Sequence, residues 1–434
     1  MLYHPSKPKS LVLLPFIIVW CLVILMLSDQ AQAQSKSWPD AFPKKGADGI
    51  PESVDKLTIA VDSWGTSELN PWTLTGVSFL GDYYNLRLMM QDPNGDLAPA
   101  WATEVNQTEA QGSATPEVER AYTRALELCQ QVGDARELVP VLFGLSRFYK
   151  KRGKLQRASE FGEQFLSLAQ DQHDSALLLC ACYALGDTLF WQGEFMAARA
   201  HLEQGIAFHA PRPYDTYAFL YEPEPALSCL GVLSLTLWFL GYPDQALQRS
   251  HEALALAQES SHPYSLAKAL ANAAALHALR REWQTLKERA ETLQTLAAAQ
   301  GFAELLATAT RSYGLALVEQ GQIVEGIAQM QQSMATLHML RTEDGQATHL
   351  AQLAKMYGRA GQSEEGLRLL TEAMAARQDT EERFDDVGRL RLQGELLLML
   401  PYPDERQAAS YFRQALPLLA DNGQSRSSCE LRCA

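Results

Sequence analysis

Most of the chain shows the hydrophobic periodicity of α-helices. From Pro116 onward, apolar residues recur at spacings of three and four, and the alternating patterns typical of strands disappear. Short turns interrupt this pattern at even intervals, and they centre on Gly153, Gly193, Gly241, Arg281, Gly321 and Gly361. Only the interval from Gly193 to Gly241 is longer than the others. A period of about 40 residues predicts stacked helix–turn–helix units, here over residues 116–434.

Small residues near each turn predict how the two helices of a unit pack. The residue five positions after the turn is usually small, in the series Ala158, Ala198, Ala246, Leu286, Gly326 and Gly366. Gly186 and Gly314 stand seven positions before their turns, and Tyr149 and Tyr357 stand four before theirs. We expect close helix crossings at the small residues and a core filled by the tyrosines. A seventh unit, two positions out of step, contains Ala408, Phe412 and Ala415.

Leu185-Gly186 before one turn and Ala198 after it resemble the consensus of tetratricopeptide (TPR) repeats. That consensus has Leu-Gly before the turn and Ala, an aromatic residue and Ala after it. The resemblance covers residues 116–434 and implies an all-α fold, a right-handed α-solenoid of about seven TPR-like helix pairs. It also implies binding of a protein or peptide partner. Because the period is longer than that of ordinary TPR units, the units look most like the long-repeat TPR variants of MalT-like bacterial regulators.

Several units, among them residues 188–209 and 317–334, resemble the C-terminal tails of bacterial signalling proteins. In those proteins a class III adenylate/guanylate cyclase or a kinase module, followed by an AAA-type ATPase, precedes the TPR tail. The resemblance implies a regulatory or sensory role in signal transduction. The sequence has no G-x-x-x-x-G-K-[ST] phosphate loop, which ATPase modules of that kind require. We therefore expect a non-catalytic scaffold without a cofactor.

Residues 1–33 have the pattern of a signal peptide. Lys7 and Lys9 precede an apolar run over residues 11–27, and Ala31-Gln32-Ala33 supplies small residues at a cleavage site. The mature chain is expected to begin at Gln34 and to be exported to the periplasm. Alternatively, the apolar run stays as a membrane anchor, although its length is at the lower limit for a span.

Residues 34–105 have a different character from the repeats. Residues 57–61 predict a buried strand, residues 92–95 (Asp-Pro-Asn-Gly) predict a turn, and Leu-Ala-Pro-Ala-Trp-Ala follows at 97–102. This order resembles the start of family 5 (oligopeptide-type) extracellular solute-binding proteins. The resemblance implies a truncated α/β fragment, because it covers only a small part of the length that such a protein needs. Residues 106–115 read as a linker.

Two alternatives to an exported scaffold therefore remain. The first is a fragment of an exported solute-binding protein of an ABC transporter. The second is a chimeric gene product, in which a solute-binding start was joined to the tail of a cyclase or ATPase. In the chimeric case the N-terminus is a fusion artefact and the repeats belong in the cytoplasm.

Composition excludes several kinds of site. A net charge of -14 disfavours nucleic acid as a partner, because phosphate neutralisation needs a basic face. The seven cysteines contain no C-x-x-C and no zinc-site spacing, and the nine histidines include no helical ligand pair, so no metal site is expected. Four cysteines lie in apolar helical stretches and are predicted to be buried: Cys129, Cys180, Cys182 and Cys229.

The TPR resemblance places a partner groove on the first helix of each pair. Counting back from the turns gives an aromatic strip beside a basic one, which suits an extended peptide with an acidic or carboxylate end. The candidate groove residues are Arg147, Lys150, Tyr183, Asp187, Phe190, Trp191, Leu235, Trp238 and Phe239. Lys151 adds to the basic strip. Alternatively, the aromatic residues fill the interface between adjacent repeats, because burying an aromatic side chain stabilises the fold more than exposing it on a surface.

Overall fold

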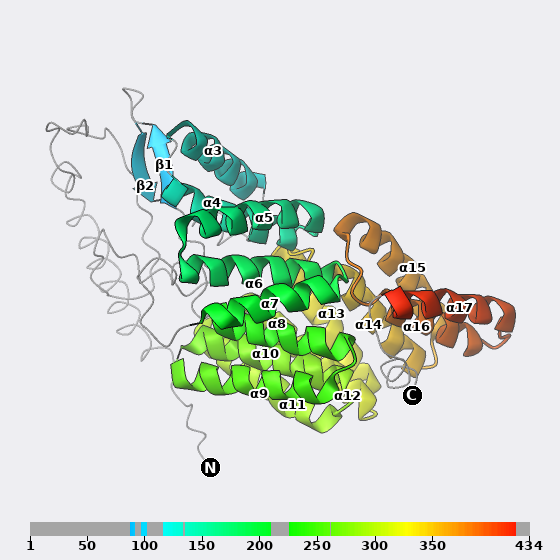
Figure 1. Ribbon diagram of the computed structural model, residues 1–434. Helices are drawn as coiled ribbons and strands as arrows, with labels where there is room; N and C mark the ends of the chain where they lie inside the picture. The colour runs from blue at the N-terminus through cyan, green and yellow to red at the C-terminus, as the bar shows by residue number, and fades with distance from the viewer. Residues whose placement is uncertain are drawn as a thin grey trace, which may run out of the picture. The chain divides into compact units, whose positions relative to one another are not determined.

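The computed structural model describes residues 87–91, 97–101, 116–132, 135–209, 225–260 and 262–421. From residue 116 onward, the described residues are almost entirely helical (Figure 1). None of the helices in the described ranges is both long and apolar enough to cross a membrane.

Within the described residues, the helices form seven consecutive pairs after a first single helix, α3 (Pro116–Val132). Within each pair the two helices pack against each other. The pairs are α4 (Ala135–Lys151) with α5 (Leu155–Gln172), α6 (Ser175–Trp191) with α7 (Phe195–Phe208), α8 (Pro225–Phe239) with α9 (Pro243–Ser260), α10 (Pro263–Leu279) with α11 (Trp283–Gln300), α12 (Ala303–Glu319) with α13 (Ile323–Met339), α14 (Gln346–Arg359) with α15 (Ser363–Thr380), and α16 (Asp386–Leu398) with α17 (Glu405–Asp421).

The first six pairs share one turn geometry. Each residue predicted to centre a turn has a positive φ, between 60° and 92°, and Arg281 adopts this left-handed conformation without being glycine. The next residue donates its N–H to the carbonyl four positions before the turn residue, at 2.8–3.0 Å in all six turns. This is the Schellman arrangement that ends a helix at a left-handed residue. The repeat predicted from the spacing of the turns is thus confirmed as a repeated hydrogen-bonded structure.

The predicted small residues lie where paired helices cross. Ala158, Ala198 and Ala246 are fully buried, and so is Leu286. Gly314 and Gly326 lie at a close crossing of α12 and α13: a Cβ on either would lie 2.5–2.7 Å from the other's carbonyl oxygen. Only glycine fits such an approach, because carbon and oxygen cannot come that close. In the seventh pair, Ala408 and Ala415 are buried as predicted.

The first helices of the pairs pack against one another along the array. Each first helix contacts the first helix of the next pair, in the order α4, α6, α8, α10, α12, α14 and α16. Each second helix packs against its own partner and against the first helix of the following pair. The core between them is built mainly of Leu, Ala and Phe. Tyr149 is buried and Tyr357 is partly buried against the core, as predicted. The cysteines at 129, 180, 182 and 229 are also buried as predicted.

Before the helices in the sequence, β1 (Arg87–Gln91) and β2 (Leu97–Trp101) form a two-stranded sheet. The two strands flank the turn predicted at residues 92–95. That turn, the signal peptide, the strand at 57–61, the linker and the segment 210–224 all lie outside the described residues.

Candidate functional site: the inner face of the repeats

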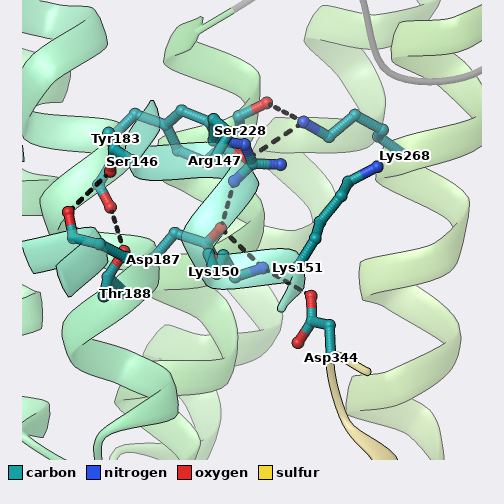
Figure 2. A network of polar contacts seen from close by, with 12 residues as sticks. Ser146, Arg147, Lys150, Lys151, Tyr183, Asp187, Thr188, Ser228, Lys268 and Asp344 are labelled. Carbon is teal, nitrogen blue, oxygen red and sulfur yellow. Dashed lines mark hydrogen bonds and ion pairs between the residues drawn. The ribbon is translucent and has the colours of Figure 1, made fainter. Parts of the chain in front are cut away.

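A buried cluster of charges lies at the C-terminal end of α4. Arg147, Lys150 and Lys151 belong to the last two turns of this helix, where cations are favoured by the helix dipole. Arg147 Nη1 and Lys150 Nζ both contact Asp187 Oδ2 of α6, at 2.6 and 3.0 Å. Figure 2 shows Asp187 lying between the two cations. The carboxylate therefore joins the inner helices of the first two pairs.

The same cations also bind acids from the far end of the array. Lys150 Nζ lies 3.0 Å from Asp344 Oδ2, and Lys151 Nζ lies 3.0 Å from Glu304 Oε2. Glu304 is in the first turn of α12 and Asp344 just precedes α14, so these acids lie near the positive ends of their helices. In addition, the Glu343 N–H donates to the Lys151 carbonyl at 3.0 Å. The array thus curves until its first and late pairs meet.

A second set of closing contacts involves α6 and the segment before α16. The Trp191 carbonyl accepts hydrogen bonds from the N–H groups of Arg383 and Phe384, at 2.9 and 3.2 Å. The Phe384 ring lies 4.9–5.6 Å, centroid to centroid, from the rings of Phe190, Trp191 and Phe239. We call these two sets of contacts the closure. Its two lysine ion pairs join positions 194 and 153 apart in the chain.

Burial and neighbouring charge set the protonation of the closure. Burial by itself would raise the pKa of Asp187, but Lys150 and Arg147 outweigh it, so that pKa lies below its ordinary value. The pKa of Asp344 is raised, because burial and the charges of Asp187 and Glu304 together exceed the effect of Lys150. The three cations of α4 thus face three carboxylates of the chain itself, and their charge is compensated internally.

A buried carboxylate also fixes the segment before α16. Glu382 accepts a hydrogen bond from the Thr348 hydroxyl, and Arg389 Nη1 contacts its Oε1 at 3.1 Å. Both Glu382 and Arg389 are almost completely buried. Burial raises the pKa of Glu382 to about 7, against the opposing charge of Arg389. Burial therefore favours the protonated form of this carboxyl more than in an exposed glutamate.

A cavity of about 830 Å³ lies on the inner face, and residues from both sets of closure contacts line it. Its volume is in the range of ligand pockets. One part of its lining is apolar and aromatic, with Phe190, Trp191, Leu235, Phe239, Trp283 and Phe384. Another part is polar, with Arg311, Glu319, His349, Gln352, Lys355 and Arg359. These residues come from α6, α8, α11, α12 and α14 and from the segment before α16.

The candidate groove residues fall into three groups. Those that line the cavity are Phe190, Trp191, Leu235 and Phe239. Those that form the buried charge cluster are Arg147, Lys150, Tyr183 and Asp187. Trp238 is only partly buried and packs against the core.

The aromatic members also pack between repeats. Phe195 stacks on Phe239 at 5.0 Å, and Phe190 lies edge-on to Phe239 at 5.7 Å, so the same rings form both the inter-repeat core and a cavity wall.

Several residues of the inner face were not predicted. Glu304 and Asp344 stand at the same distance before the turn residues Gly321 and Gly361, so an alignment of the repeats places these two acids at one position. Phe384 and Glu382 lie in the segment before α16, where the regular period has ended, and no repeat position indicates them. Among the described residues, no group of His, Cys, Asp and Glu has an arrangement that could hold a metal ion.

Several solved structures are similar to this array at low sequence identity. A Rap protein complexed with Competence and Sporulation Factor has a TM-score of 0.55 at 14% identity, over 74% of this chain and 86% of that chain. Aspartyl phosphate phosphatase F from Bacillus subtilis has a TM-score of 0.47 at 12% identity, over 74% and 84%. A signal transduction ATPase (STAND) protein with a tetratricopeptide repeat sensor, from Pyrococcus horikoshii, has a TM-score of 0.42 at 11% identity, over 76% and 52%. No protein-family model and no curated protein matches the sequence. The repeated helix pairs and the first of these likenesses define the array as a TPR-type α-solenoid.

Proposed function

We propose that the helical array is a non-catalytic TPR scaffold whose inner cavity binds a short segment of a protein or peptide partner. The observation that carries this proposal is the cavity of about 830 Å³, lined by aromatic side chains from several inner helices. Aromatic side chains give large contact areas at low entropic cost and are enriched where proteins recognise partners. A wall of Phe190, Trp191 and Phe239 suits the apolar side chains of a peptide.

The wider fold supports this proposal. The Rap protein with the same fold over 86% of its length was solved complexed with Competence and Sporulation Factor. A solenoid of this length is therefore able to hold a partner. A scaffold role also agrees with the charges of the inner face, because Asp187, Glu304 and Asp344 each form ion pairs that fix structure.

The biological setting is a finer proposal that rests on sequence resemblance. The array fits a regulatory or sensory tail of bacterial signal transduction, of the kind that follows cyclase or AAA-type ATPase modules. Residues 1–33 fit an export signal, and the β1–β2 pair lies within the fragment that resembles a solute-binding protein. Sequencing the N-terminus of the protein from a periplasmic fraction tests export: Gln34 is expected first, and an uncleaved cytoplasmic chain overturns it.

Selection from a displayed library of random short peptides tests the scaffold proposal. The full chain is compared with Leu235→Arg and Ala275→Met, which place a charge and extra volume in the cavity. Val324→Arg, at a residue of α13 that is 86% exposed and outside the cavity, is the matched control. Wild type and control should enrich the same peptides, and both cavity variants should lose them while melting normally. Unchanged enrichment by correctly folded cavity variants would exclude the cavity as the binding site.

A further inference from the structure

The last described helix pair leaves one side of α17 exposed. In the earlier pairs the second helix packs against the first helix of the following pair, as α9 does against α10. Leu254, eight positions after the small residue Ala246 of α9, is 8% exposed and belongs to a cluster with residues of α10. Leu416 stands eight positions after the corresponding Ala408 but is 60% exposed. The side of α17 that a further pair would cover is therefore accessible to a partner.

Exposed apolar side chains gather at this last pair. Eight large apolar residues of the described chain are exposed, and half of them belong to α16, to α17 or to the turn between them: Leu398, Met399, Tyr402 and Leu416. The outer side of a terminal repeat is ordinarily polar, because it has to keep the solenoid soluble. A group of apolar side chains at such an end indicates an interaction surface.

Five exposed residues form one stripe along α17, because their spacings of three and four place them on one side of the helix. We call them the α17 stripe: Tyr402, which just precedes the helix, Glu405, Ala409, Arg413 and Leu416. The stripe is symmetric about Ala409. Glu405 and Arg413 lie four positions before and after it, and Tyr402 and Leu416 lie seven positions before and after it.

The two charges of the stripe have no ion-pair partner within the described chain. Arg413 Nε donates to the Ala409 carbonyl of its own helix at 3.1 Å, and no described carboxylate pairs with this guanidinium. Glu405 and Arg413 are about 12 Å apart along the helix axis, so they do not reach each other. Both charges are therefore available to a partner that carries the opposite sign at each end.

A second copy of the same helix has the required arrangement. When two copies pack antiparallel about a two-fold axis, a residue before the axis faces the residue that lies equally far after it in the other copy. With the axis at Ala409, Glu405 of each copy faces Arg413 of the other, and Tyr402 faces Leu416. The small side chain of Ala409 lets the two helices approach closely. Parallel packing would instead place each charge beside its own kind.

We propose that the α17 stripe is the surface through which two copies of this chain associate, as an antiparallel helix pair with its two-fold axis at Ala409. Such an interface is isologous, so each charge pair and each apolar contact forms twice. None of the stripe residues lines the inner cavity, and the association therefore does not depend on partner binding there.

Charge reversal tests the surface and its register. The full chain is studied by sedimentation equilibrium over a series of concentrations, and wild type should associate to a dimer. Glu405→Arg places like charges opposite each other at both symmetric contacts, and so does Arg413→Glu. Each single variant should weaken the dimer about 10- to 100-fold, because two attractive pairs become two repulsive ones.

Mixing the two single variants tests the pairing itself. One copy then carries two positive charges on the stripe and the other carries two negative charges, so the mixed dimer should regain about wild-type affinity. The double variant Glu405→Arg/Arg413→Glu should regain it alone. Gln407→Arg is the matched control, because Gln407 is exposed on α17 but points about 200° away from Glu405 around the helix. It should associate as wild type does, and a circular dichroism melt of each variant verifies folding.

Three outcomes overturn the proposal. A wild-type chain that stays monomeric leaves this side of α17 to a different protein. A dimer that neither charge reversal weakens has its contact elsewhere on the chain. Single variants that weaken the dimer but do not recover on mixing exclude the antiparallel register. In each case the peptide-library result for the inner cavity stands independently.

Discussion

Substitution of Asp187 by Asn tests the buried charge cluster of the inner face. The change removes one negative charge and keeps the side-chain shape. It leaves Arg147 without its carboxylate, whereas Lys150 retains Asp344. Breaking a buried ion pair by removing one partner costs about 3–5 kcal/mol. Because one of the two cations keeps a partner, we expect the lower end, about 3 kcal/mol.

A thermal melt followed by circular dichroism measures this loss. For domains of about 150–250 residues, 1 kcal/mol corresponds to about 2–4 °C in melting temperature. The array is larger, so about 3 kcal/mol should lower its melting temperature by about 6 °C. Glu203→Gln is the matched control, because the Arg199–Glu203 pair lies on the surface of α7 at 2.8 Å. Exposed pairs contribute less than about 1 kcal/mol, so this control should move by no more than about 2 °C.

The pH dependence supplies an internal check. The folded-state pKa of Asp187 lies below its ordinary value, since the cations outweigh burial. Its contribution is therefore complete above the pKa of the unfolded chain and is lost as the pH falls through the folded-state pKa. The difference between wild type and Asp187→Asn should be full at pH 7 and shrink in strong acid. A melting temperature of Asp187→Asn that equals that of wild type at pH 7 would show that the Asp187 carboxylate does not stabilise the fold.

Two further changes test other parts of the structure. Glu382→Gln should flatten the pH dependence of stability, because the folded-state pKa of Glu382 is raised to about 7. Wild type should therefore lose stability relative to this variant as the pH rises from about 4.5 to about 7. Paired thermal melts across that range measure the difference. Gly314→Ala should lower the free energy of unfolding by about 1–3 kcal/mol, measured by urea denaturation, because its Cβ would lie 2.7 Å from the Gly326 carbonyl oxygen. The control Val324→Ala, at the exposed surface, should change it by less than about 0.5 kcal/mol.

The repeat itself could be predicted because local interactions define it. A left-handed residue is required at each turn, and glycine at five of the six positions makes the period visible. Arg281 shows that the period also identifies a turn whose residue type gives no signal. The close crossing of Gly314 with Gly326 follows from the same period, since two small residues face each other at fixed distances from the turn.

The closure could not be predicted from the sequence. Whether Lys150 meets Asp344 depends on the curvature of the whole array, which is the sum of small rotations between successive pairs. Lys150 and Lys151 therefore looked available for a ligand, although the folded chain supplies their partners.

Photo-crosslinking shows directly whether a partner binds in the inner cavity. A benzophenone amino acid is placed at Ala275, in the cavity lining, and at Val324, on the exposed surface of α13. Each protein is irradiated with a peptide enriched from the displayed library. A covalent adduct is expected at position 275 and none at position 324. An adduct confined to position 324 would contradict this expectation.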